Sequence, residues 1–474
     1  VDAQDIDEYR LTLKAPLAFG KPAYISPNPQ NQKSEETNQL FFFDKNQVSS
    51  TGILASFGEF QVFDFSLTYH LYNPTNQTAL TKVAFPPDTS YQKLTYRAIK
   101  PQPEKIEVDE DGNWLGVYKL KAKEKYDVVA SGQVKIFAHP HTATSLDLQP
   151  DDLQKYLQPQ KYWESENPQI RSLAQKLKTP KAIYDYVVSI LEYDYSRVRK
   201  GAKRLGAIEI LSTPQRAICM EYTDLFIALA RAAGIPAREL NGFAYTTNSA
   251  LQPLSLVQDV LHAWPEYWDN QKKTWIQVDP TWGDTTGGVD YFSKLDLGHF
   301  VFAVHGLDSQ LPLPAGSYKT DTEIQKDVEV IFGQYKEPVP PTLQVDFLLP
   351  NTLMTERPTE GKIRITNAGS EALYNFNLTL KTENLKLLTS NTPSFLILPP
   401  FATQEIPLKV AAPSFTSGTG KIIISGNNQK FEYQLTYESI ILGKFLPILG
   451  GLLFILGGVV LYKFTKSRFF KKAV

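Results

Sequence analysis

A single cysteine, Cys219, is the feature that most restricts how this chain of 474 residues can be built. One thiol forms no disulfide within the chain. It also excludes zinc sites with two or more cysteine ligands, iron–sulfur clusters and redox-active cysteine pairs. The chain must therefore be stabilised by buried apolar side chains, and 42% of its residues are hydrophobic. At roughly 100–200 residues per domain, the length allows about two to four domains.

The charges of the chain nearly cancel, with 49 basic and 50 acidic residues. A net charge of −1 gives no electrostatic reason to expect a nucleic acid as a partner. The six histidines are scattered along the sequence without an HExxH motif. We therefore expect neither a zinc site nor another metal or cofactor. The sequence leaves the oligomeric state open.

The segment 445–462 contains no charged residue. As a helix it would be about 27 Å long, close to the roughly 30 Å of a bilayer core. The tail at 463–474 that follows has basic residues and no acidic one. These features predict a single transmembrane helix at 445–462 and a cytoplasmic tail. They place the chain in the cell membrane, with its bulk extracytoplasmic. A buried core helix is the alternative interpretation.

Residues 1–145 have the pattern of an all-β domain, which we expect to be sandwich-like. Apolar and polar residues alternate from 63 to 71, with the period of two that is typical of a half-buried strand. Turn-forming residues at 111–113 separate two further strand patterns. They predict a β-hairpin.

Residues 150–335 combine helical and strand patterns, which predicts an α+β domain. Apolar residues recur at three- and four-residue spacing over 173–191 and again over 225–233, as in helices that bury one face. Gly234 and Pro236 are placed to end the second of these segments.

The rest of the chain returns to a β pattern after a short proline-rich segment. Residues 336–341 predict a stiff linker. Over 342–438, strand patterns alternate with turns, and an immunoglobulin-like β-sandwich fits this length.

Cys219 lies at the start of the second predicted helical segment. A thiol at a helix N-terminus is near the positive end of the helix dipole, which favours the thiolate and hence a nucleophile. A lone cysteine is more often a small buried hydrophobic residue. Its position alone leaves both interpretations open.

A second pattern indicates a partner for this thiol. Segments 261–268 and 275–279 predict a β-hairpin with its turn at 270–271. In that register His262 faces Asp279, at a Cβ separation of about 4.5–5.5 Å that allows a carboxylate to bond an imidazole. A bulge near Pro265 would make this pair diagonal. A thiolate attacks an acyl carbon, an imidazole moves the proton and a carboxylate orients the imidazole.

Three separated blocks around these residues resemble the transglutaminase-like domain, a variation on the papain-like thiol fold. In chain order the blocks are Cys219-Met220-Glu221-Tyr222-Thr223-Asp224-Leu225, His262-Ala263-Trp264-Pro265-Glu266 and Trp275-Ile276-Gln277-Val278-Asp279-Pro280-Thr281-Trp282. The resemblance covers about residues 165–310. It implies that Cys219 is the nucleophile, His262 the general base and Asp279 the acid that orients His262. Ala217 stands where the family often has a glycine, a mild departure from its pattern.

Other residues are candidates for the surroundings of this site. An oxyanion donor is needed, and the backbone N–H of Cys219 or the side chain of Gln215 could supply it. For Gln215, a surface turn is the favoured interpretation. Four aromatic residues either line the site or belong to the core: Tyr193, Tyr195, Trp264 and Trp282.

The sequence thus predicts a multidomain α+β fold. In it, a papain-like transglutaminase core is flanked by two all-β sandwich-like domains and followed by one transmembrane helix. The resemblance implies a membrane-anchored, extracytoplasmic thiol enzyme that cleaves or transfers acyl groups at amide bonds of proteins or peptides through a thioester. We favour hydrolysis, as in cysteine peptidases, because nothing outside the core motifs resembles the calcium-dependent animal cross-linking enzymes. The alternative is a non-catalytic cell-surface binding or scaffold protein.

Overall fold

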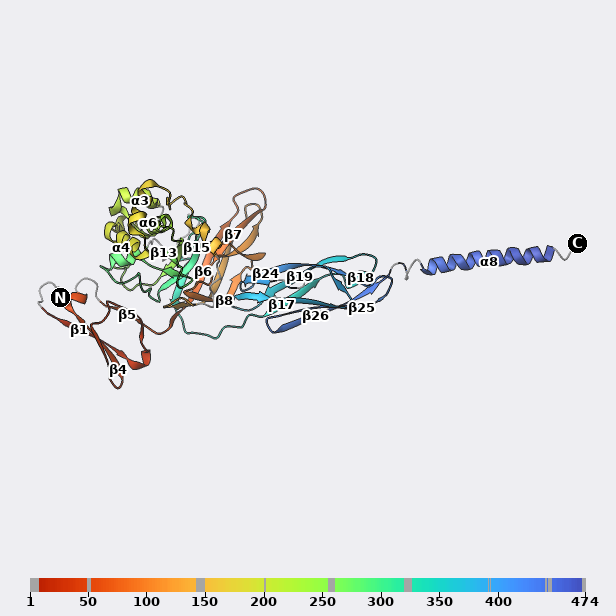
Figure 1. Cartoon of the computed structure of the whole chain (residues 1–474), viewed down its shortest axis with the longest axis horizontal. Helices are drawn as coiled ribbons and strands as arrows, with labels where there is room; N and C mark the ends of the chain where they lie inside the picture. Colours follow the sequence, from red (N-terminus) through yellow and green to blue (C-terminus); the bar gives the residue numbers. More distant parts are fainter. Residues whose placement is uncertain are drawn as a thin grey trace. The chain divides into compact units, whose positions relative to one another are not determined.

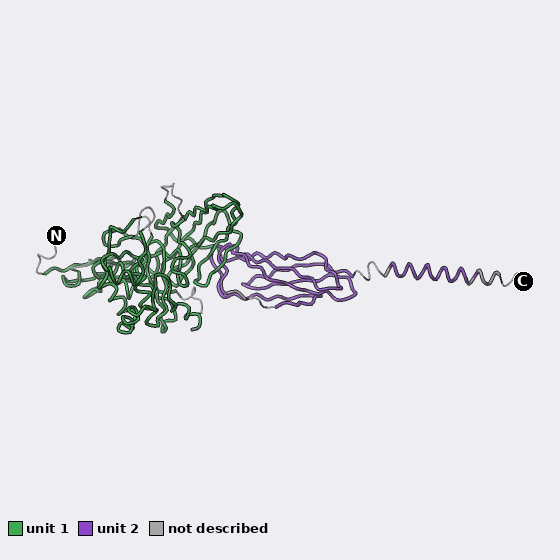
Figure 2. The backbone as a smooth tube through the Cα atoms, turned by 90° about the horizontal axis from the view of Figure 1, so that it is seen from above, with its two compact units in different colours: residues 1–339 green, residues 340–474 purple. Residues whose placement is uncertain are grey.

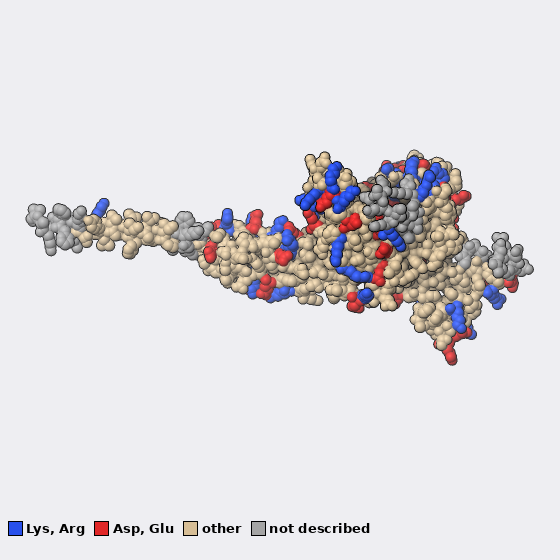
Figure 3. Space-filling view, turned by 180° about the vertical axis from the view of Figure 1, so that it is seen from behind, with Lys and Arg blue, Asp and Glu red and all other residues tan. Residues whose placement is uncertain are grey.

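We describe the protein from a computed structural model, which defines residues 8–48, 53–141, 150–199, 202–254, 261–318, 326–390, 392, 394–439, 441 and 446–470. The chain is mostly β, with 42% strand and 21% helix. The predicted α+β class is therefore corrected, because the strands of the core and of the regions on either side outweigh the helices. The chain divides into two compact units, 1–339 and 340–474 (Figure 2). On the face drawn in Figure 3, basic and acidic side chains are interspersed.

The first unit begins with two small antiparallel sheets, in the order β1-β4-β3 and β2-β5. Phe41 and Phe43 alternate along β4 and are buried in a small core of their own. The elements are β1 (Arg10–Pro16), β2 (Pro22–Ser26), β3 (Asn31–Ser34), β4 (Asn38–Asp44), α1 (Lys45–Val48) and β5 (Leu54–Phe57).

Two further antiparallel sheets follow, one of four strands in the order β16-β6-β11-β8 and one of three in the order β7-β10-β9 (Figure 1). The hairpin predicted around 111–113 is confirmed, since Trp114 of β10 pairs with Val108 of β9. The strands are β6 (Phe60–Tyr72), β7 (Ala79–Phe85), β8 (Gln92–Lys100), β9 (Lys105–Val108), β10 (Trp114–Leu120), β11 (Lys125–Phe137) and β16 (Val328–Phe332). β16 lies far along the chain, after the helical region, yet it completes the sheet of β6.

Between β11 and β16 along the chain, helices pack on an antiparallel sheet of order β14-β13-β12-β15 (Figure 1). The predicted helical patterns are confirmed. The first is divided between α3 and α4, because Pro180 begins a new helix. Gly234 follows α6 with a left-handed φ of 79°, as a helix stop requires. The elements are α2 (Pro150–Gln154), α3 (Pro168–Leu177), α4 (Pro180–Ile190), α5 (Gly206–Ser212), α6 (Cys219–Ala232), β12 (Ala237–Ala244), β13 (His262–Asp269), β14 (Thr274–Gln277), α7 (Pro280–Thr285) and β15 (His299–His305).

Two buried amides hold β15 against the preceding β region. Gln92 accepts from the backbone N–H of Val301 at 2.8 Å and donates to its carbonyl at 2.9 Å. Asn113 makes the same pair of bonds with Val304, at 2.7 and 2.8 Å. These side chains satisfy backbone groups at an edge of the sheet, so they fix the strand on which part of the site is built.

The second unit contains two four-stranded sheets, in the order β17-β19-β24-β22 and β18-β26-β25-β21, and a pair β20-β23. The buried side chains of Ile363 and Ile365 alternate with exposed or half-buried ones along their strand. The strands are β17 (Leu343–Leu348), β18 (Thr352–Met354), β19 (Thr359–Asn367), β20 (Leu373–Asn377), β21 (Thr379–Glu383), β22 (Lys386–Leu387), β23 (Ser394–Leu398), β24 (Thr403–Ala411), β25 (Gly418–Gly426) and β26 (Gln429–Glu438).

The predicted transmembrane helix is wrong, and with it the predicted membrane location. The C-terminal helix α8 spans Leu446–Phe470. Throughout the part of the chain that the structure describes, no helix has both the length and the apolar character needed to cross a membrane.

Candidate active site

Cys219 is the first residue of α6, as the sequence predicts, and its side chain is buried. The backbone before the helix is extended at Ala217 and Ile218, and it turns into the helix at the cysteine. The carboxylate of Glu221 accepts the backbone N–H of Ile218 at 3.0 Å, which satisfies one of the free donors at the helix start.

A buried ion pair holds the start of α6. The guanidinium of Arg197 donates to both carboxylate oxygens of Glu221, at 3.1 and 3.2 Å. Glu221 also accepts the backbone N–H of Leu205 at 3.0 Å. Arg197 thus compensates the charge of this buried carboxylate. The bond from Leu205 ties the segment before α5 to the helix that carries the thiol.

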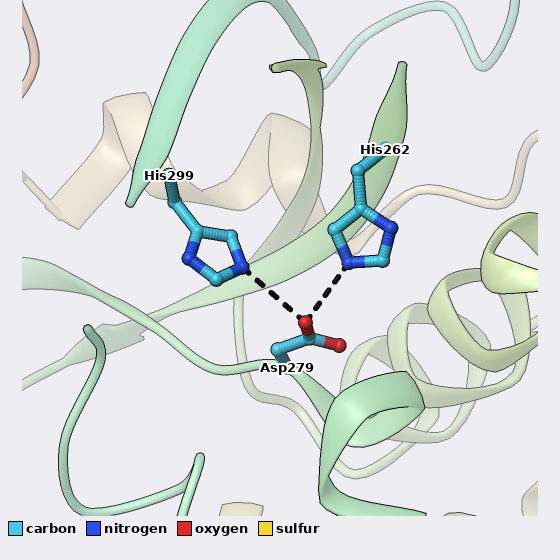
Figure 4. Close-up of side chains that lie close together, drawn as sticks. All are labelled: His262, Asp279 and His299. Carbon is cyan, nitrogen blue, oxygen red and sulfur yellow. Dashed lines mark hydrogen bonds and ion pairs between the residues drawn. The ribbon is translucent and has the colours of Figure 1, made fainter. Parts of the chain in front are cut away.

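His262 and Asp279 come together as predicted. His262 begins β13, and its Nε2 lies 2.9 Å from Oδ2 of Asp279, with both side chains buried. The other carboxylate oxygen accepts the backbone N–H of Trp282 at 3.0 Å, so Asp279 also caps α7. A hydrogen bond at each oxygen fixes the carboxylate. The carboxylate in turn fixes the imidazole ring (Figure 4).

The predicted hairpin register is wrong by two residues. Glu266 pairs with Gln277, and the strands close at Asp269 and Thr274 around a four-residue loop, 270–273. Lys273 in this loop has a left-handed φ of 53°, a conformation that strand and turn patterns do not predict. Contact between His262 and Asp279 therefore does not come from strand pairing. It arises because Asp279 lies beyond β14, in the extended conformation of a helix cap.

Sequence reasoning missed a second histidine at this carboxylate. His299 begins β15, and its Nε2 lies 3.3 Å from the same Oδ2 of Asp279 (Figure 4). Its Nδ1 lies 2.8 Å from Oδ1 of Asp296. Asp296, three residues before His299 in the sequence, is the local signal that this histidine could have a carboxylate partner. The strand order that brings β15 beside β12 is not readable from local patterns.

His262, Asp279 and His299 are compact enough to hold a metal ion, with one ligand atom of each within 4.8 Å of the others. The separations of 2.9 and 3.3 Å at Asp279 are equally those of N–H···O hydrogen bonds. Protons on the two rings account for both contacts, and we describe the group as a hydrogen-bonded set.

The charges of this set shift its pKa values strongly. Burial alone would raise the pKa of Asp279, but the charge and hydrogen bond of His262, followed by those of His299, hold it well below its usual range. Burial lowers the pKa of His262. The charge and hydrogen bond of Asp279, and then those of Cys219, outweigh burial and raise it to about 10. The geometry therefore favours an imidazolium at His262 beside an ionised Asp279.

The thiol lies beside the same imidazole. Cys219 contributes to the raised pKa of His262 through a hydrogen bond and through its charge. In Figure 4, Nδ1 of His262 faces away from Asp279 and His299. Within the described residues this buried nitrogen has no partner that meets full hydrogen-bond geometry. Nδ1 is thus the ring nitrogen left for the thiol.

The two predicted tryptophans pack on the imidazoles. The ring of Trp282 stacks on His262 with centroids 5.0 Å apart, and Trp264 stacks on it at 5.8 Å. Both indoles are buried, and their N–H groups bond to the carbonyl of Pro253 and to Gln277. They exclude water from the His262 ring, which strengthens its interaction with Asp279.

The remaining predicted residues are placed differently. Gln215 is exposed, in a short 3-10 turn (Pro214–Arg216). Tyr193 lies next to Ala217 through a parallel bridge, and its ring is 4.8 Å from that of Tyr195. Burial, followed by the charge of Cys219, raises the pKa of Tyr193. Its buried hydroxyl makes no hydrogen bond within the described residues.

Comparison with known proteins agrees with the resemblance in the sequence. Residues 166–280, which include Cys219, His262 and Asp279, match the family model of the transglutaminase-like superfamily. A protein-glutamine gamma-glutamyltransferase of Pseudomonas aeruginosa is 31% identical over 124 residues, which are 24% of this chain. The chain spans only 18% of the length of that relative.

Two solved structures are similar at low identity. One is described as a candidate cysteine protease from Cytophaga hutchinsonii, with 17% identity, a TM-score of 0.35, and coverage of 58% of this chain and 87% of that one. The other is the periplasmic domain of TgpA from Pseudomonas aeruginosa bound to ethylmercury, with 18% identity, a TM-score of 0.27, and coverage of 48% and 91%. The family match by itself shows that the chain contains a transglutaminase-like domain over residues 166–280.

Proposed function

We propose that this chain, which carries a transglutaminase-like domain over residues 166–280, is a thiol enzyme acting on amide bonds of proteins or peptides. The observation that carries the proposal is the buried 2.9 Å contact between His262 and Asp279 beside the thiol at the start of α6. In thiol and serine enzymes, a carboxylate in this position fixes the imidazole and stabilises its cation. The glutamyltransferase name of the curated relative supports acyl chemistry of this kind.

The proposed reaction proceeds through a thioester. The thiol of Cys219 gives its proton to Nδ1 of His262, and the sulfur attacks the carbonyl carbon of the amide. The C–N bond then breaks, and His262 returns the proton to the leaving amine or ammonia. In the second half, water gives a proton to His262 and attacks the thioester. The C–S bond then breaks, and His262 returns the proton to the departing sulfur, which releases a carboxylic acid and the free thiol. If an amine attacks in place of water, the product is a new amide.

We favour water as the second reactant, because nothing outside the core motifs resembles the calcium-dependent cross-linking enzymes. Mass spectrometry of a glutamine-containing peptide separates the two outcomes. Hydrolysis converts the amide to a carboxylic acid, whereas transfer attaches an added primary amine.

The Cys219→Ala variant tests the proposal. We expect it to abolish release of ammonia or of peptide fragments from protein and peptide substrates, since no other thiol is present in the chain. Its thermal unfolding, measured in parallel, shows that the loss is not one of folding. An activity that persists unchanged in this variant would contradict the proposal.

A non-catalytic binding protein is the second candidate, and the complete burial of Cys219 favours it. Alkylation of the native chain by iodoacetamide separates the two candidates, because the single cysteine makes every modification report on this site. An enzyme reacts faster at neutral pH than the same chain unfolded in urea. Equal or slower reaction of the native chain identifies an inert, structural thiol.

A further inference from the structure

His299 lies between two carboxylates in the interior of the first unit. Its Nδ1 is 2.8 Å from Asp296 and its Nε2 is 3.3 Å from Asp279. The side chain is completely buried, and the indoles of Trp264 and Trp282 pack edge-on against it at 4.9 and 4.8 Å. Water therefore cannot replace either contact, and both ring nitrogens depend on these two oxygens.

Both carboxylates already accept hydrogen bonds from other donors. Asp296 accepts the backbone N–H of Gly298 at 2.8 Å and the hydroxyl of Tyr291 at 3.2 Å. Asp279 accepts from His262 and from the backbone N–H of Trp282. Each carboxylate is thus surrounded by donors, which favours its ionised, accepting form.

A neutral imidazole has one N–H group and one accepting nitrogen. Two ionised carboxylates, one at each nitrogen, require two N–H groups. We therefore propose that His299 is an imidazolium held between Asp296 and Asp279, and that it acts as a positioning residue whose positive charge sets the pH range in which Cys219 and His262 work. This inference rests on the proposed function of that pair.

The groups that surround His299 agree with this assignment. The carboxylates of Asp296 and Asp279 are the ionised neighbours, the ring of His262 is 5.8 Å away, and the ring of Tyr291 is 6.4 Å away. Burial lowers the pKa of His299, but the charge of Asp296 and the hydrogen bonds to both carboxylates raise it above its ordinary value.

The sign of the effect on the catalytic pair follows from Coulomb's law. The positive charge of His299 disfavours a second positive charge on His262, and it favours a negative charge on the sulfur of Cys219. If His299 is replaced by neutral glutamine, the imidazolium of His262 becomes more stable and the thiolate less stable. Both changes move the reactivity of Cys219 to higher pH.

The pH profile of Cys219 alkylation measures this effect on the full chain. With iodoacetamide as the probe, we expect the midpoint of the rate profile in His299→Gln to lie about one pH unit above that of the unsubstituted chain. Loss of packing alone would change the rate without moving the midpoint. A midpoint within about 0.3 units of the unsubstituted value would overturn the proposal.

His305→Gln is the matched control. His305 ends the same strand and is equally buried, and its nitrogens contact Glu239 at 3.3 Å and the carbonyl of Pro312 at 2.7 Å. It is also a histidine, but it lies at the end of β15 opposite to His299. We expect this variant to leave the midpoint unchanged, and an equal shift in both variants would overturn the proposal.

Nitrogen-15 NMR of the unsubstituted chain, labelled at histidine, gives a second test. It needs no turnover, and the variant serves only to assign the signals. The signals that disappear in His299→Gln are expected to show protons on both ring nitrogens at pH 7. If those signals show one protonated nitrogen, His299 is neutral and the proposal fails. If the native thiol reacts no faster than in urea, the proposed function fails instead, whatever the charge of His299.

Discussion

At the scale of single residues, Asp279 is the centre of the site. Its carboxylate accepts hydrogen bonds from His262, from His299 and from the first turn of α7. It therefore orients two imidazoles and caps a helix. The sequence alone identifies one of these partners, His262, through the hairpin pattern and the family blocks. It does not identify His299, because this contact joins the cap of α7 to the beginning of β15, 20 positions along the chain, and the place of β15 depends on the sheet order.

The hydroxyl of Tyr193 is a residue-scale prediction of its own. It is buried without a hydrogen-bond partner in the described residues and lies in the field of Cys219. We expect Tyr193→Phe to leave the free energy of unfolding within about 0.5 kcal/mol, because no hydrogen bond is lost. If the hydroxyl donates to the oxygen of the acyl group during attack, the rate falls about tenfold or more. Turnover and urea unfolding of the same preparation measure both quantities, and a variant of full activity excludes the role.

The raised pKa of His262 links stability to pH. Its value of about 10 in the folded chain exceeds the roughly 6.5 of an unfolded histidine, because Asp279 and then Cys219 outweigh the effect of burial. The stabilisation is complete below about pH 6.5 and is lost as the pH rises toward 10. We expect the urea midpoint to fall between pH 6.5 and 9.5 more steeply in the unsubstituted chain than in His262→Gln. Parallel curves for the two proteins would contradict the assignment.

At the scale of elements, regular patterns are predictable and their junctions are not. The start of α6 at Cys219 and its stop at Gly234 follow from capping and periodicity. The β13–β14 register was mispredicted, because a two-residue turn was assumed where Lys273 adopts a left-handed conformation in a longer loop. Asp279 reaches His262 only because the strand ends early and the next helix needs a cap.

The buried ion pair at the start of α6 gives an element-scale prediction. Glu221→Gln leaves the charge of Arg197 without its partner at a site where the carboxylate is completely buried. We expect the free energy of unfolding to fall by about 3–5 kcal/mol and the alkylation of Cys219 to slow toward its unfolded rate.

The exposed pair of Lys181 and Asp185, one turn apart on α4, is the control for this change. Asp185→Asn is expected to cost at most about 1 kcal/mol, because solvent screens the pair. If Glu221→Gln costs no more than this control, the ion pair does not hold the helix start.

At the scale of the whole molecule, the order of β and mixed segments along the chain is predictable from periodicity. Which segments pack together or share a sheet is not. Phe63 and Phe65 of β6 contact Phe243 and Phe300 of the core sheet, with centroids 6.0 and 5.4 Å apart. Such contacts depend on which strands lie side by side, and local sequence does not encode this. The uncharged C-terminal segment is a helix as its composition predicts, but no helix among the described residues is long and apolar enough to cross a membrane.

A truncation tests the cohesion of the first unit. We expect residues 1–339 alone to unfold in one cooperative transition and to keep the alkylation rate of Cys219, because they form one compact unit. Residues 150–335 alone lose the amides of Gln92 and Asn113, which satisfy the β15 backbone. We expect that shorter fragment to aggregate or to unfold at lower urea concentration. Equal stability of the two fragments would show that the β region is dispensable for the core.

The pairing of β16 with β6 has a mechanical consequence. β16 is the last strand before the segment that leads to residue 340, and it is bound to β6 along five paired residues from Val328 to Phe332. Gln133 adds bonds to the carbonyl of Gln334 and the N–H of Lys336 just beyond it. A pulling force applied through the second unit would therefore load this ladder first. The ladder would bear the force, and the loop carrying Asp279 and the helix carrying Cys219 would not be stretched.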